Sequence, residues 1–95
     1  MGGLGPIPGG NKTLRNVSAA TVIKSTAGTI VTVSVTVAGA AGALYDNNST
    51  STGNTAANLI AVVPAVVGIF ALNWPCAVGI TYVPGAAQVA SFAFS

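Results

Sequence analysis

The chain has 95 residues, enough for one small domain, and only 4% of them are charged. Three basic residues stand beside a single acidic residue, Asp46, and there is no histidine. These counts exclude paired catalytic carboxylates, a Ser-His-Asp set and a cluster of metal ligands. We therefore expect no enzyme, no cofactor, no metal site and no small-molecule substrate. The net charge of +2 is too small for a nucleic-acid partner.

Residues 1–17 are predicted to form a glycine- and proline-rich arm that precedes a domain at residues 18–95. The first 12 residues are dominated by glycine and proline, which disfavour both helix and sheet. Such a segment is either a frayed terminus or an extended arm that orders on a partner. The candidate contact residues of the arm are Leu4, Ile7, Lys12 and Arg15.

From residue 18 onward the pattern is typical of β-structure. The clearest strand is 30–37, where valines alternate with threonine and serine. A period of two places Val31, Val33, Val35 and Val37 on one face, which we expect to be the core face. Further short strands are predicted at 20–25, 43–46, 59–63, 66–74, 78–83 and 88–94.

These segments, separated by glycine, proline and polar turns, predict an all-β fold. About seven or eight short strands at this spacing favour a small β-sandwich or jelly roll. A long polar loop is expected at 47–58. No window of the sequence shows sustained helical spacing.

The strand at 66–74 is apolar on both faces, which predicts that it is covered on both sides. One cover is the second sheet, and the other is a neighbouring subunit. The high hydrophobic content of 52% supports this interpretation, because so small a domain cannot bury that much apolar surface alone. We therefore predict that Phe70, Trp74, Phe92 and Phe94 are interface residues.

Three further features have a structural and a functional interpretation. Asp46 follows a strand, so we expect it to cap a turn or to pair with a basic residue. Cys76 lies in an apolar context and is expected to be a buried structural thiol. The aromatic residues Tyr45, Trp74 and Tyr82 either pack in the core or an interface, which we favour, or form a sugar-binding platform.

A membrane partner is not expected. The most apolar run, 59–72, is shorter than the roughly 20 residues of a spanning helix and is rich in strand-forming residues. No lysine or arginine follows Lys24, so nothing flanks the run to orient it. The alternative is a holin-like small membrane protein.

The strand pattern resembles small virion proteins of tailed bacteriophages. The similarity covers about residues 20–95 and includes Val22-Ile23-Lys24-Ser25, Gly28 and the alternating strand 30–37. It continues with Leu44-Tyr45-Asp46 and the ending Gly79-Ile80, Val83-Pro84-Gly85 and Val89. Among such proteins are capsid decoration, or cement, proteins with a small jelly-roll or β-sandwich fold.

The resemblance implies a structural role on the outside of a virion capsid. The expected partners are the major capsid protein and further copies of the chain, as a dimer or a trimer. Two alternatives remain open: a tail, adaptor or head-fibre associated virion protein, and a receptor- or glycan-binding module. The resemblance offers no catalytic residues.

Overall fold

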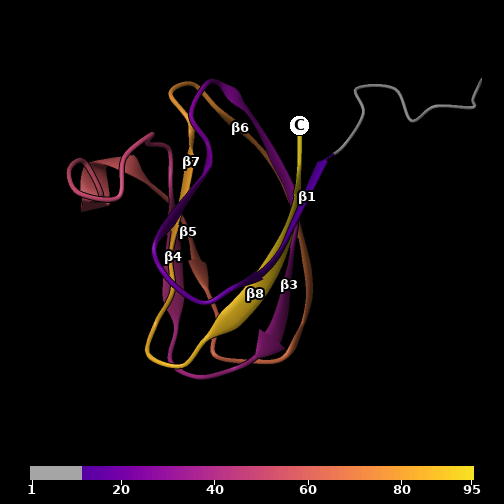
Figure 1. Cartoon of the computed structure of the whole chain (residues 1–95). Coiled ribbons are helices and arrows are strands. Elements are labelled where there is room, and N and C mark those ends of the chain that lie inside the picture. The colour runs from indigo at the N-terminus through magenta and orange to yellow at the C-terminus, as the bar shows by residue number, and fades with distance from the viewer. Residues whose placement is uncertain (1–11) are drawn as a thin grey trace, which may run out of the picture.

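The computed structural model describes residues 12–95, which form a sandwich of two four-stranded antiparallel sheets (Figure 1). Sheet A has the strand order β1-β8-β3-β6, and sheet B has the order β2-β7-β4-β5. The strands of sheet A are β1 (Lys12–Val17), β3 (Gly28–Val37), β6 (Gly68–Cys76) and β8 (Val89–Phe94). Those of sheet B are β2 (Thr21–Lys24), β4 (Gly42–Tyr45), β5 (Leu59–Val63) and β7 (Ile80–Val83).

The topology is that of a jelly roll. Each strand of the first half of the chain pairs antiparallel with one of the second half, as β1–β8, β2–β7, β3–β6 and β4–β5. This pattern is a long hairpin rolled into two sheets. The predicted all-β sandwich or jelly roll is thus confirmed, and each of the seven expected strands is present.

The core lies between the inner faces of the two sheets. Tyr82 of β7 and Phe92 of β8 meet there, with ring centroids 4.7 Å apart and planes tilted by 59°. The other buried hydrophobic residues are Val17, Ile23, Ile30, Val33, Val35, Leu44, Val63, Cys76, Ile80, Ala90 and Phe94. Each sheet contributes one face to this cluster because its side chains alternate between core and exterior.

The strand β3 departs from strict alternation. Its register with β8 shifts between Ile30 and Thr32 and again between Val35 and Val37. Each shift inserts one extra residue, which reverses the face of the side chains beyond it. Val33 and Val35 are buried as predicted, whereas Val37 is 48% exposed, so the prediction that it faces the core is wrong. At the other end, Ile30 lies in the core, whereas Val31 is only partly buried and does not belong to the core cluster, so its predicted core position is also wrong.

The first strand corrects the predicted domain boundary. Residues 12–17, assigned to the arm, form β1 and pair with β8 at the edge of sheet A. Val17 is buried in the core, and Leu14 packs against it. The sandwich therefore begins at Lys12 rather than at residue 18. The rest of the predicted arm lies outside the described residues.

We expect a chain that begins at Ser18 to be markedly less stable than one that begins at Lys12. Loss of β1 removes Leu14 and Val17 from the core and leaves β8 with an unpaired edge. Burial of a single such side chain contributes about 1.5–3 kcal/mol. Urea unfolding followed by circular dichroism compares the two chains, and equal midpoints would show that the domain begins after β1.

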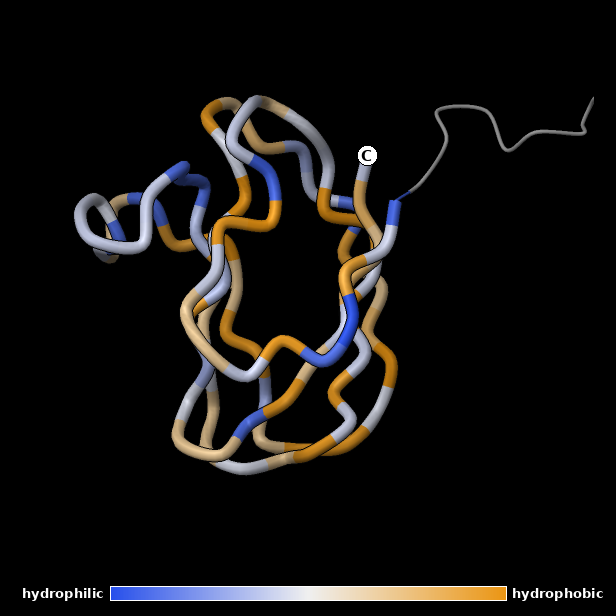
Figure 2. The backbone as a smooth tube through the Cα atoms, in the orientation of Figure 1, coloured by the Kyte–Doolittle hydropathy of each residue, from blue (hydrophilic) through white to orange (hydrophobic). Residues whose placement is uncertain are grey.

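One projecting loop is rich in hydrophilic residues. Figure 2 shows it as a largely blue and pale segment between β4 and β5, which holds the short 3-10 helix η1 (Ala56–Asn58). The buried amide of Asn47 organises this loop: its Nδ2 donates to the carbonyl oxygens of Ser49 (3.0 Å) and Thr52 (2.6 Å) and to Asn54 Oδ1 (3.0 Å). The predicted polar loop is thus ordered around one side chain.

Candidate interaction surfaces

The two sides of the sandwich differ in charge. The outermost strands on one side are β1 and β2, joined by residues 18–20, and on the other side β5 and β6, joined by 64–67. All three basic residues of the chain, Lys12, Arg15 and Lys24, lie on β1 and β2. We call this side the basic edge. Residues 47–95 contain no charged side chain at all.

The opposite side is apolar and exposed. The segment from Leu59 to Leu72, which covers β5, its connection and the first half of β6, is here called the neutral edge. Its most exposed large hydrophobic residue is Ile69 of β6, at 76%. The other large hydrophobic residues exposed along it are Leu59, Val62, Val66 and Val67. Exposed apolar residues gathered in this way are typical of a protein interface.

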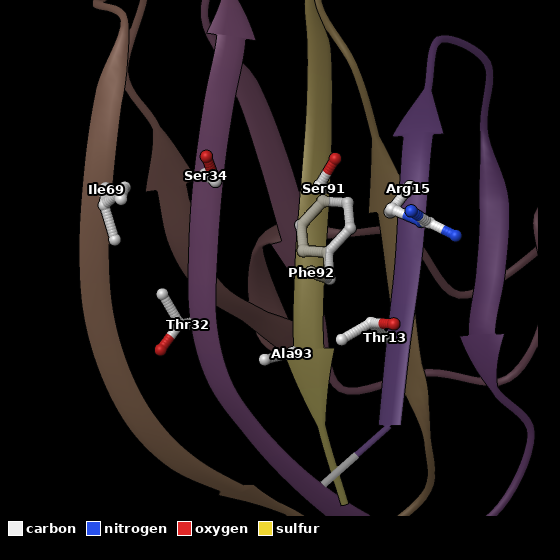
Figure 3. Close-up of a pocket in the computed structure, with 8 residues that line it drawn as sticks. All are labelled: Thr13, Arg15, Thr32, Ser34, Ile69, Ser91, Phe92 and Ala93. Carbon is white, nitrogen blue, oxygen red and sulfur yellow. The ribbon is translucent and has the colours of Figure 1, made fainter.

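A shallow groove of about 400 Å³ crosses the outer face of sheet A (Figure 3). Arg15 of β1 lies at one end of the labelled row and Ile69 of β6 at the other. Between them stand small side chains, mostly with hydroxyl groups: Thr13, Thr32, Ser34, Ser91 and Ala93. The floor of the shallow groove is therefore lined by small residues, with the cation of Arg15 at one end and the large apolar side chain of Ile69 at the other.

The predicted contact residues fall into three groups. Lys12, Arg15 and Trp74 are exposed, the last at 53%, and Phe70 is half-buried on β6. Phe92 and Phe94 are only 2% and 8% exposed because they face the core, so their assignment as interface residues is wrong. Leu4 and Ile7 lie outside the described residues.

The aromatic residues do not form the suggested sugar-binding platform. Tyr82 is fully buried, and its hydroxyl donates to Gln88 Oε1 at 2.5 Å. Burial raises the pKa of Tyr82 to about 12. Since one of its three proposed members is a core residue, the platform of Tyr45, Trp74 and Tyr82 is excluded.

Gln88 belongs to the same buried network and was missed by the sequence analysis. Its side chain is completely buried just before β8, where Nε2 donates to the carbonyl oxygens of Val63 (3.3 Å) and Pro64 (3.0 Å). The network therefore fixes the end of β5, where the neutral edge turns toward β6.

Asp46 is a structural anchor. Its carboxylate accepts hydrogen bonds from the backbone N–H groups of Ala77 (3.0 Å), Val78 (2.8 Å) and Gly79 (3.2 Å). Burial alone would raise the pKa of this carboxyl, but the three donors outweigh it and lower the pKa from its ordinary value of 3.8. Asp46 therefore ties the end of β4 to the loop between β6 and β7, and the expected turn-capping role is confirmed.

We expect Asp46→Asn to lower the free energy of unfolding at neutral pH by about 1–2 kcal/mol, because an amide oxygen accepts these bonds more weakly than a carboxylate. The folded-state pKa lies below that of the unfolded chain. The extra stability of the wild type is therefore complete above about pH 4 and is lost as the pH falls through the folded pKa. Denaturant titrations from about pH 7 to about pH 2 should show the two curves converging in acid; a constant gap would contradict this role.

Cys76 is a buried thiol at the end of β6, as predicted. Burial, together with the negative charge of Asp46, raises its pKa to about 11. The thiolate that reacts with oxidants and metals is therefore scarce at neutral pH. Cys76 acts as a small hydrophobic residue that packs in the core.

Within residues 12–95, no group of three or more His, Cys, Asp or Glu side chains is placed to hold a metal ion. No helix in the same range has the length and apolarity required to cross a membrane.

In comparisons with known proteins, no protein-family model, curated protein or solved structure matches the chain.

Proposed function

We propose that the chain is a structural virion protein of a tailed bacteriophage, which decorates the outer surface of the capsid shell as a homo-oligomer. The observation that carries the proposal is the exposed, uncharged neutral edge on a jelly-roll domain. Large apolar residues along a sheet edge favour assembly with another protein. Viral capsid domains are among the proteins that use the jelly roll. The resemblance of residues 20–95 to small virion proteins supports the same role.

The mechanism is stabilisation by binding. A protein that binds the assembled shell, and not its separated subunits, stabilises the shell in proportion to affinity and concentration. Several weak contacts in one oligomer act together, because each further contact is made at a high effective concentration. The only carboxylate side chain of this chain, that of Asp46, is already engaged with backbone N–H groups. The cations of the basic edge would therefore complement acidic residues on the surface of the major capsid protein.

Quantitative mass spectrometry of purified particles tests the proposal. We expect the chain to be present in hundreds of copies, in a fixed ratio to the major capsid protein. A few copies, or about a dozen as an order of magnitude for one symmetric ring, would support a tail, adaptor or head-fibre protein instead. Absence from washed particles would contradict a virion role.

A further inference from the structure

The first half of β6 is an unprotected sheet edge. Proteins normally protect an edge strand by making it short, by placing charges or proline on it, or by a bulge. On the basic edge, β1 carries two cations and a register shift beside Asn16, whose φ is 57°, and β2 has only four residues. On β6 the register with β3 shifts between Ala71 and Trp74, beside Asn73 with a φ of 49°, and Pro75 follows. The stretch Gly68–Leu72 carries no charge and no proline, and its register with β3 is regular as far as Ala71.

The side chains of this stretch have incomplete cover. Phe70 and Leu72 face inward and pack against the core, but they remain partly exposed because, within residues 12–95, no strand lies beyond β6. Ile69 stands on the outer face of the same strand, next to the small residues of the groove (Figure 3). A further strand paired to β6 would cover all three side chains and satisfy the free backbone groups.

Charge decides which strand fits there. The basic edge of another copy would bring Lys12 or Arg15 against an apolar surface that offers no counter-charge, which is unfavourable. The neutral edge of another copy carries no charge to bury and presents the same Ile69, Phe70 and Leu72. An uncharged apolar patch is complementary to itself, as a two-fold contact requires.

We propose that Gly68–Leu72 of β6 pairs antiparallel with the same segment of a second copy across a two-fold axis. The A sheets of the two copies then form one continuous sheet, while the basic edges remain free at both ends. This pairing rests on the homo-oligomer of the proposed function. It identifies the surface through which two copies bind each other, and it specifies that the oligomer is a dimer. It does not depend on a shell, so it is tested on the isolated protein.

Sedimentation equilibrium of the full chain is the first test. We expect wild type to have about twice the 9.2 kDa mass of the chain. Ile69→Lys should raise the dissociation constant of the dimer by at least about 100-fold, since two-fold symmetry makes each substitution count twice. The matched control is Thr13→Lys, at an exposed position of the other edge strand of sheet A that lines the same groove. It should remain dimeric, and circular dichroism should show that both variants keep the β-fold.

Cysteine cross-linking locates the contact. Ile69→Cys or Ala71→Cys should give a disulfide-linked dimer on mild oxidation, whereas Thr13→Cys should not; the native Cys76 is buried and should not react. A monomeric wild type, a mass of three chains, or a dimer that survives Ile69→Lys would overturn the pairing. If the isolated protein is dimeric but absent from particles, the pairing stands and the proposed capsid role fails.

Discussion

Phe92→Ala should lower the free energy of unfolding by about 3–5 kcal/mol, which is the usual cost of removing a buried aromatic ring. Phe92 lies at the centre of the core, where it contacts Tyr82 across the two sheets. Its removal leaves a cavity between the sheets that the surrounding strands can only partly fill. Urea unfolding followed by circular dichroism measures the change.

Val78→Ala is the control for this substitution. Val78 is 47% exposed in the loop between β6 and β7, so its truncation should change the stability by no more than about 0.5 kcal/mol. If Phe92 were instead an assembly contact, Phe92→Ala would leave the unfolding midpoint unchanged and weaken only self-association. That result would contradict the core described here.

Gln88→Leu should destabilise the fold by about 2–4 kcal/mol although it inserts an apolar side chain into the core. The change leaves the buried hydroxyl of Tyr82 without its acceptor and removes the donor to the carbonyls of Val63 and Pro64. Buried polar groups that lose their partners bear the full cost of lost hydration.

A double-mutant cycle isolates this network. Tyr82→Phe removes the hydroxyl that Gln88→Leu would leave unpaired, so the double variant should lose less stability than the sum of the single losses. We expect a coupling of about 0.5–3 kcal/mol from urea unfolding of all four proteins. Strictly additive losses would show that the two side chains do not interact.

The strands could be predicted because alternation is a local property. The alternating pattern alone predicts that Val33 and Val35 face the core, and both are buried. The strand β1 was missed because its register shift separates the inward side chains of Leu14 and Val17 by three residues instead of two. Bulges depend on the partner strand, which is distant in sequence, and they also explain why Val37 is exposed.

The candidate surfaces were predictable only in part. The sequence places Phe92 and Phe94 on one face of a strand, but it does not say whether that face is inner or outer. The packing of the two sheets settles this point, because Phe92 and Phe94 are buried and Phe92 contacts Tyr82 of sheet B. The separation of charge between the two edges also depends on topology, which brings β5 and β6 to one side and β1 and β2 to the other.

A three-dimensional reconstruction of the intact particle decides whether the protein decorates the capsid. We expect density for this sandwich at regularly repeated positions on the outer surface of the capsid shell. The neutral edge should face a second copy, and the basic edge should face the shell. Density confined to the tail, or a shell surface without the protein, would contradict a decoration role.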